Sequence, residues 1–177
     1  EALGYYQQAL KISEQLKSKA SMSQDHGNLG LCLLGLGDVD AALAHLDQAI
    51  EFATEAGMRQ DQAYWLRVKG DGLVERGQYP LGLLNHRAAL AVYERIGAQA
   101  ELLEALHDFG ELHLLLGDSA SAERDFQRSL GVARSIGLDR GITMNLISLG
   151  DVEFRRKRPE AAIALYEQAR QRATASK

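Results

Sequence analysis

The chain has very few of the residues that build disulfides, membrane spans and strands. Cysteine occurs once, at position 32, so no disulfide can form within the chain and we expect a reducing, cytoplasmic location. The longest apolar run, 29–36, is too short to cross a membrane and contains two glycines. Proline occurs twice, aromatic residues make up 6%, and no segment alternates apolar and polar residues as a strand does. These absences favour an all-α protein outside the membrane.

The charge balance and the missing motifs narrow the function. The formal net charge of −4 argues against a surface for nucleic acid or anionic membrane, since both need a basic face. The chain carries no phosphate-binding loop, no HExxH zinc motif and no GxSxG elbow, and its five histidines lack a serine or cysteine at a recognisable spacing. We therefore expect no enzymatic activity and no cofactor.

Glycine is abundant, and it recurs at a fixed interval of 40 residues. Three columns show this spacing: 30, 70, 110 and 150; 37, 77 and 117; and 57, 97 and 137. A period in this range indicates repeated units that stack on one another. The stretch 99–137 shows the unit clearly, as two amphipathic helices joined at Gly117-Asp118. The sequence predicts an all-α solenoid of stacked antiparallel helix hairpins, with about nine helices.

The repeat arranges residues 1–177 as a single array. Residues 1–19 are expected to form the second helix of an incomplete repeat, and four hairpins follow at 20–57, 58–97, 98–137 and 138–175. Since the chain lacks an initiator methionine and starts inside a repeat, we expect a piece of a longer protein. The expected boundary residues are the N-caps Asp38 and Asp118, the first-turn prolines Pro80 and Pro159, and the helix-ending glycines Gly57, Gly97 and Gly137.

One glycine column falls in the middle of helices, where glycine costs about 1 kcal/mol relative to alanine. Its recurrence predicts that the second helix of each hairpin crosses so closely that only a hydrogen atom fits. The facing positions are small: Ala42, Gly82, Ala122 and Ala162. The residues expected to fill the space beside the glycines are Leu46, His86, Phe126 and Tyr166, of which His86 is the odd member.

These positions resemble the pattern of the tetratricopeptide repeat. An apolar residue precedes the helix glycine at Leu29, Phe109 and Leu149, whereas Lys69 departs from the pattern. The 40-residue period is similar to that of kinesin light chains, spindle-orientation adaptors and bacterial regulators such as the maltose-regulon activator. The resemblance implies a right-handed superhelix whose first helices line a concave face. It also implies that the protein binds a peptide or protein segment.

The resemblance places one set of side chains from each first helix on the concave face. They are Asn28, Tyr64, Arg67, Asp71, Glu75, Glu104, His107, Asp108, Glu111, Ser148, Asp151 and Arg155. Among them Asp71, Glu111 and Asp151 recur at 40-residue spacing, and such an acidic ladder would favour a basic or amide-rich partner segment. The alternative is that these carboxylates are solvated and keep the face soluble.

Other side chains have a structural interpretation beside a functional one. His107 and Glu111 are spaced to share a metal, with His113 nearby, but no third ligand is evident and we expect no metal site. Cys32 is expected to pack as a small hydrophobe, and the basic run 155–158 to be a solvated helix end. Trp65 is expected to pack between hairpins, the alternative being an anchor for a partner.

The first helix carries apolar residues, Leu3, Tyr6 and Leu10, that no helix of its own repeat would cover. Either upstream repeats cover them or two copies of the chain meet there as a homodimer. For the whole protein, the first hypothesis is a non-enzymatic interaction scaffold that binds a segment of another protein in its concave groove. The second is a sensor or regulatory module of a larger bacterial signalling protein or transcription activator. Neither predicts direct contact with nucleic acid or membrane.

Overall fold

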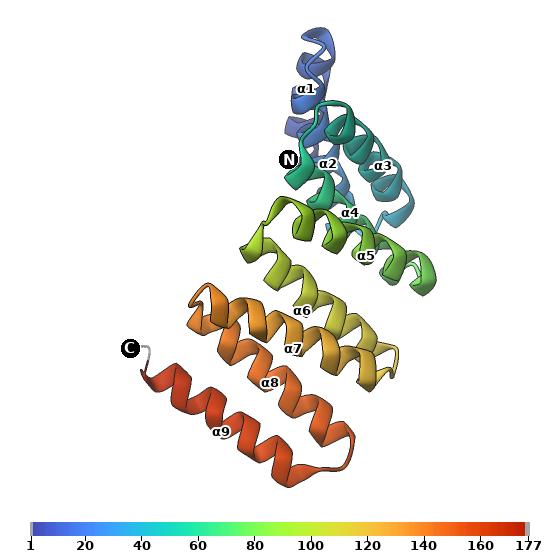
Figure 1. The fold of residues 1–177 in the computed structure, drawn as a ribbon. Coiled ribbons are helices and arrows are strands. Elements are labelled where there is room, and N and C mark those ends of the chain that lie inside the picture. The colour runs from blue at the N-terminus through green and yellow to red at the C-terminus, as the bar shows by residue number, and fades with distance from the viewer. Residues whose placement is uncertain (1, 176–177) are drawn as a thin grey trace. The chain divides into compact units, whose positions relative to one another are not determined.

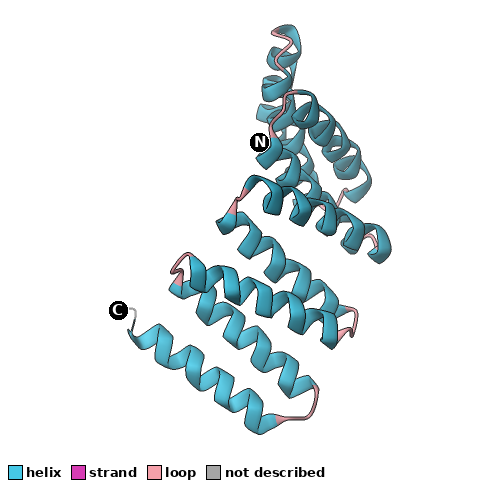
Figure 2. Cartoon of the chain, viewed as in Figure 1, coloured by secondary structure: helices cyan, strands magenta, loops and turns pink. Residues whose placement is uncertain are grey.

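The protein is built from α-helices joined by short connectors, as the computed structural model of residues 2–175 shows (Figures 1 and 2). Over this range there are nine helices and no strands, which confirms the all-α prediction. No helix in the described range is long and apolar enough to cross a membrane. The chain divides into two compact units, Glu1–Ile96 and Gly97–Lys177. The arrangement of both units as one continuous array stays a prediction.

The first unit contains five helices. They are α1 (Ala2–Gln15), α2 (Lys19–Gly35), α3 (Val39–Glu55), α4 (Arg59–Glu75) and α5 (Tyr79–Ile96). Helix α2 forms a hairpin with α3, and α4 forms a hairpin with α5. The hairpins pack on each other through α3 and α4, and α1 packs on α2.

The second unit repeats this arrangement with four helices. They are α6 (Gln99–Leu115), α7 (Ser119–Ser135), α8 (Asp139–Arg155) and α9 (Pro159–Ala175). The hairpins are α6–α7 and α8–α9, and they pack on each other through α7 and α8. Their core contains Phe126, Leu130, Ile142, Leu146 and Leu149.

The connectors have the same length throughout. Helices α2 to α9 begin at residues 19, 39, 59, 79, 99, 119, 139 and 159, so a helix and its connector together take 20 residues. A left-handed residue lies in every connector. It is glycine, with φ between 68° and 80°, at positions 37, 57, 77, 97, 117 and 137, but Lys17 (φ 53°) and Lys157 (φ 59°) occupy the same place in the first and last connectors.

The predicted boundary residues lie where expected. The side chains of Asp38 and Asp118 accept hydrogen bonds from the backbone N–H groups of Ala41 (3.2 Å) and Ser121 (3.0 Å). Both prolines lie in the first turns of α5 and α9. One N-cap was not predicted: the Ser18 hydroxyl accepts from the backbone N–H of Ser21 at the start of α2.

The helix glycines mark the closest crossings within hairpins, as predicted. A Cβ atom built on Gly110 would lie 2.6 Å from Cε1 of Phe126, and one on Gly30 would lie 2.7 Å from Cγ of Leu46. The same overlap occurs in the remaining two hairpins, between Gly70 and His86 and between Gly150 and Tyr166. Because such contacts are far inside van der Waals distance, only glycine allows the large residue to occupy this place.

Trp65 packs between hairpins, which confirms the structural interpretation of this residue. Its ring lies over Gly27 of α2, and it belongs to an apolar cluster with Leu46, Ala49 and Val68. The alternative of a solvent-exposed anchor is wrong for Trp65, since the residue is buried. Cys32 is only partly buried.

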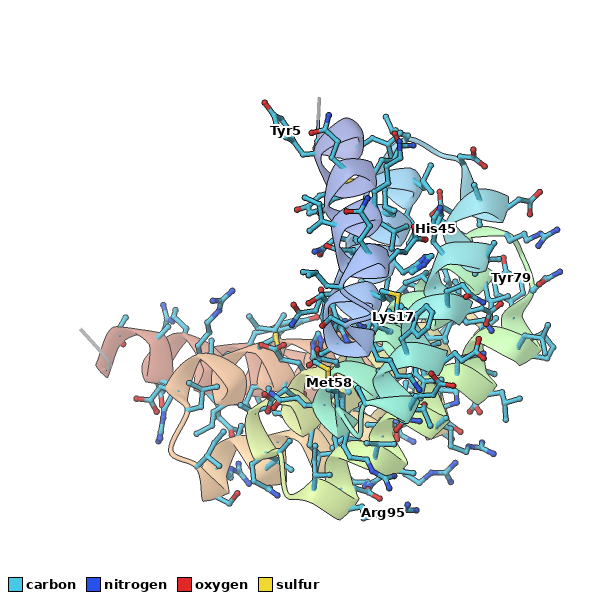
Figure 3. All side chains as sticks on the ribbon, turned by 90° about the horizontal axis from the view of Figure 1, so that it is seen from above. Tyr5, Lys17, His45, Met58, Tyr79 and Arg95 are labelled. Atoms are coloured by element: carbon cyan, nitrogen blue, oxygen red, sulfur yellow. The ribbon has the colours of Figure 1, made fainter. Side chains whose placement is uncertain are left out.

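Helix α1 has apolar side chains on more than one side. Leu3, Tyr6 and Leu10 are partly buried, whereas Tyr5 is 72% exposed and projects away from the helix (Figure 3). Ile12 and Leu16 are also exposed. The exposed apolar surface of α1 therefore differs from the one that the sequence predicted.

Candidate functional site

The predicted partner-binding residues of the first unit lie mostly along one side of α4. Tyr64, Arg67, Asp71 and Glu75 follow one another at spacings of three and four residues, which places them on one helix face. The guanidinium carbon of Arg67 lies 5.4 Å from the centre of the Tyr64 ring, a cation–π distance. Asn28, on α2, is partly buried.

In the second unit, the corresponding residues of α6 and α8 form a single surface. We call it the α6–α8 surface, and it consists of Glu104, His107, Asp108, Glu111, Ser148, Asp151 and Arg155. Two kinds of contact join its helices: His107 Nε2 lies 3.0 Å from the Ser148 hydroxyl, and the Arg155 guanidinium donates to the Leu114 carbonyl at 3.3 Å. Ser148 is buried at the base of the surface, while Glu111 and Asp151 are exposed.

His107, Ser148 and Glu111 include the residue types of a hydrolytic triad, but their geometry is different. Ser148 lies against His107 Nε2, and its hydroxyl also donates to Glu111 Oε1 at 3.4 Å. Glu111 Oε1 lies 3.9 Å from the same Nε2 atom. In a triad the acid holds the other ring nitrogen, so that Nε2 can take the serine proton. The three residues therefore form a polar cluster that suits hydrogen bonding to a partner.

Two acids of the predicted ladder are held by the residues that fill the space beside the helix glycines. His86 Nε2 lies 3.1 Å from Asp71 Oδ1, and the Tyr166 hydroxyl donates to Asp151 Oδ1 at 2.7 Å. Sequence reasoning missed both pairs. The available signal was a polar residue at 86 and 166, where Leu46 and Phe126 stand in the other hairpins.

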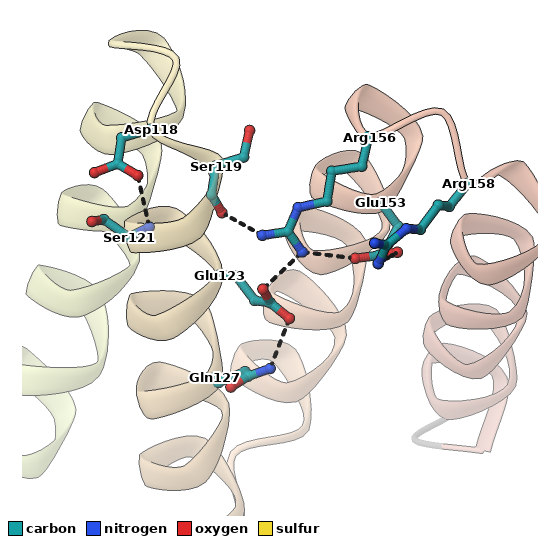
Figure 4. Close-up of polar contacts among 8 residues, drawn as sticks. All are labelled: Asp118, Ser119, Ser121, Glu123, Gln127, Glu153, Arg156 and Arg158. Atoms are coloured by element: carbon teal, nitrogen blue, oxygen red, sulfur yellow. Dashed lines mark hydrogen bonds and ion pairs between the residues drawn. The ribbon is translucent and has the colours of Figure 1, made fainter.

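The basic run 155–158 is not a uniformly solvated helix end. Arg156 joins α7 to α8, because its guanidinium donates to Glu123 (2.7 Å), to Glu153 (3.0 Å) and to the Ser119 carbonyl (3.2 Å) (Figure 4). These carboxylates raise the pKa of Arg156. Arg158 is exposed and pairs with Glu153. The run therefore stabilises the second unit.

The remaining histidines are engaged in pairs. His113, considered with His107 for a metal, instead lies with Nδ1 2.7 Å from Asp125 Oδ2. Burial raises the pKa of the Asp125 carboxyl, although the His113 hydrogen bond opposes this shift. In the first unit, Nδ1 of His26 and Nδ1 of His45 are 2.9 Å apart. Within residues 2–175, no three or more His, Cys, Asp or Glu side chains are grouped to hold a metal ion.

Comparison with known proteins agrees with this architecture. A family model described as tetratricopeptide repeat matches residues 26–55. The chain contains tetratricopeptide repeats. No curated protein matches the sequence. The assignment of these tetratricopeptide repeats to the longer 40-residue type stays a prediction.

Solved structures of other tetratricopeptide-repeat-like proteins share the fold at low sequence identity. BtubC (BKLC) from P. vanneervenii is 16% identical with a TM-score of 0.86, over 97% of this chain and 71% of that one. A putative kinesin light chain from Podosopora anserina with nearly identical TPR-like repeats is 13% identical with a TM-score of 0.80, over 99% and 87%. A Rap protein complexed with Competence and Sporulation Factor is 13% identical with a TM-score of 0.79, over 97% and 48%.

Proposed function

We propose that this protein is a non-enzymatic scaffold that binds a peptide or protein segment on the exposed side of its first helices. The observation that carries the proposal is the α6–α8 surface, where side chains from two successive first helices meet. Its donors and acceptors are fixed on rigid helices, which lowers the entropy lost on binding. Tetratricopeptide repeats are typically interaction scaffolds, and the Rap protein named above was solved in complex with a factor.

The partner segment is expected to be basic or rich in amides. Glu104, Glu111 and Asp151 are exposed carboxylates of the α6–α8 surface, and Asp71 occupies the matching position on α4. Charge-assisted hydrogen bonds from Lys, Arg, Asn or Gln to such carboxylates are strong, and the negative surface speeds the approach of a cation. The two acids held by His86 and Tyr166 are restricted in rotation, so they lose less freedom on binding.

A second candidate is a sensor or regulatory module of a larger signalling protein. This chain matches 97% of its own length but only 48% of the Rap chain, so a fold of this size occurs there as part of a longer protein. In that role, binding at the first helices would change an attached effector domain. The full-length sequence tests this idea, since a scaffold needs no attached DNA-binding or nucleotide-hydrolysing domain.

The scaffold proposal is tested by selecting binders from a random peptide library on the immobilised protein. The selected peptides are then titrated against the double variant Glu111→Gln/Asp151→Asn and against Asp71→Asn. A matched control, Glu160→Gln/Glu167→Gln, removes two exposed charges of α9 that lie outside the α6–α8 surface. We expect selection of Lys-, Arg-, Asn- and Gln-rich peptides whose affinity for the double variant falls about tenfold, while the control binds as the wild type does.

Equal binding to all variants would contradict the role of these acids, and failure to select any peptide would contradict the scaffold itself.

The exposed apolar side chains of α1 are proposed to be covered either by upstream repeats or by a second copy of the chain. Tyr5, Ile12 and Leu16 are each more than half exposed, which is costly for apolar groups in water. Small-angle scattering over a range of protein concentrations distinguishes the two cases. A strictly monomeric protein with an ordered α1 would remove the homodimer.

A further inference from the structure

A groove runs along α8 between the two second helices of the second unit, α7 and α9. Two cavities of about 580 and 370 Å³ lie along it. Both have their floor on one face of α8, formed by Ile142, Leu146, Leu149 and Glu153, which follow at spacings of four, three and four residues. We call this depression the α7–α9 groove. Its walls are Glu123, Gln127 and Arg134 of α7 and Ala161, Ala164, Leu165, Gln168, Gln171 and Arg172 of α9.

The α7–α9 groove is separate from the α6–α8 surface. At 100° per residue, the floor residues of α8 point about 160–200° away from Ser148, Asp151 and Arg155. The two surfaces therefore lie on opposite sides of the same helix. A ligand in the groove would not displace a segment bound at the α6–α8 surface.

The size of the groove fits an extended chain better than a helix. The floor from Ile142 to Glu153 is roughly 16 Å long at 1.5 Å per helical residue, so the two cavities give a cross-section of roughly 60 Å². An α-helix with a diameter of 10–12 Å needs roughly 80–110 Å². An extended segment of about five residues spans the floor, with its first, third and fifth side chains pointing into it.

One end of the groove is electrically balanced and lined by small apolar residues. Glu123 and Glu153 lie there, and both carboxylates are paired with Arg156, while Arg158 also pairs with Glu153 (Figure 4). Ala161, Ala164 and Leu165 form the wall beside them. This end is therefore suited to apolar side chains.

The other end carries a positive charge that the groove itself does not balance. Arg172 donates to Asp139 Oδ1 at 2.7 Å, so these two charges offset each other. Arg134 is exposed and lines the same cavity, beside the amides of Gln168 and Gln171. A carboxylate placed here would gain a charge-assisted hydrogen bond to Arg134 and amide hydrogen bonds as well.

We propose that the α7–α9 groove binds a short extended segment of another protein that carries two apolar side chains and an acidic side chain at alternate positions. The apolar residues lie over Ile142, Leu146, Leu149 and Ala164, and the Asp or Glu side chain pairs with Arg134. The charge preference is opposite to that of the α6–α8 surface. A partner could thus engage both sides of α8 with segments of opposite charge.

The test uses the probe acetyl-Leu-Ser-Leu-Ser-Glu-amide, whose only carboxylate is a side chain. The peptide is titrated into the ¹⁵N-labelled protein to about 5 mM, which detects a dissociation constant in the millimolar range. We expect shifts at the side-chain amides of Gln127, Gln168 and Gln171. Replacing the peptide Glu by Gln, or making Arg134→Gln, is expected to weaken binding about five- to tenfold.

Two further variants define the site. Ala164→Trp fills the groove from an exposed helix position and is expected to abolish the shifts, whereas Arg170→Gln removes an exposed charge of α9 outside the groove and is expected to have no effect. The double variant Glu111→Gln/Asp151→Asn is expected to bind the peptide as the wild type does, so this result is independent of the α6–α8 surface.

Three results would overturn the inference. The first is the absence of shifts at the highest peptide concentration. The second is a set of shifts centred on His107 and Ser148, which would place the peptide at the α6–α8 surface. The third is self-association of the protein through the groove, seen as concentration-dependent sedimentation that Ala164→Trp abolishes, because a second copy would then be the occupant.

Discussion

Tyr166 and Asp151 are joined by a hydrogen bond of 2.7 Å from the phenol to Oδ1, while the same tyrosine ring occupies the space beside Gly150. One side chain thus supports the helix crossing and also orients a carboxylate on the surface. The hydrogen bond to the carboxylate stabilises the protonated phenol and raises the pKa of Tyr166 to about 12.

Asp151→Asn is therefore expected to lower the pKa of Tyr166 towards 10, since the charge and the strong acceptor are lost. Ultraviolet titration of the tyrosines between about pH 9 and 11 should show one more group ionising in the variant than in the wild type. The combined variant Asp151→Asn/Tyr166→Phe should lose that additional group. If the wild-type and Asp151→Asn curves coincide, the hydrogen bond does not form in solution.

Gly110→Ala is expected to lower the free energy of unfolding by about 1–3 kcal/mol, because the added methyl would overlap the buried Phe126 ring. Gly131→Ala is the matched control. Gly131 lies inside α7, where a Cβ meets nothing within 4 Å, and this change is expected to raise stability by about 0.5–1 kcal/mol through helix propensity. Urea unfolding of both variants checks the pair. Equal effects of the same sign would show that the crossing is not close.

Lys157→Gly is expected to raise the free energy of unfolding by about 0.5–1 kcal/mol. Lys157 has a φ of 59° in a connector where the other copies place glycine, and a side chain in the left-handed region is strained. The reciprocal change Gly117→Lys should lower stability by a similar amount, since Gly117 has a φ of 80°. Thermal unfolding of both variants provides the measurement. No gain from Lys157→Gly would mean that interactions of the lysine offset the strain.

Stability is expected to fall as the pH is lowered from 7.5 to 6 (values about one unit on either side of a normal histidine pKa). Burial and, for His26, the neighbouring His45 lower the pKa of both histidines below 6.5 in the folded state. Glu14 and Asp25 oppose this shift at His26. As the pH falls through 6.5, the unfolded chain binds protons that the folded chain does not, so the unfolded state is favoured.

His45→Asn reduces this dependence, because one lowered histidine and its repulsion of His26 are removed. Asparagine is suitable because Asn85 stands at the same position of the next hairpin. Denaturant unfolding at several pH values should give a smaller slope for the variant and the smallest for His26→Asn/His45→Asn. Identical slopes in all three proteins would show that the pair does not affect pH-dependent stability.

The sequence predicted the parts of the fold that depend on backbone conformation and on repetition. Glycine at 40-residue spacing identified the helix crossings, and Asp38 and Asp118 identified helix starts, because these residues have few alternatives in those roles. The side-chain partners were harder to predict. Arg156 was assigned to a solvated run, but its partner Glu123 lies 33 residues earlier and becomes a neighbour only after α7 and α8 pack.

The candidate site was predictable to the same extent. Helical spacing placed Glu111, Ser148 and Asp151 on the exposed side of first helices, and their role in binding stays a prediction. The contact between His107 and Ser148 joins different hairpins and required the structure. The α7–α9 groove was not predicted at all, since it depends on the space left between two helices that are not adjacent in the chain.

The uniform 20-residue step has a consequence for how this chain finds its pairing partners. The turn inside a hairpin and the turn between hairpins have the same length and the same left-handed residue, so neither turn tells a helix which neighbour to choose. That choice lies with the glycine on one helix and the bulky side chain on the next. Deleting 40 residues would leave every surviving glycine opposite a bulky residue. Deleting 20 would join two helices of the same kind and leave the glycine notch empty.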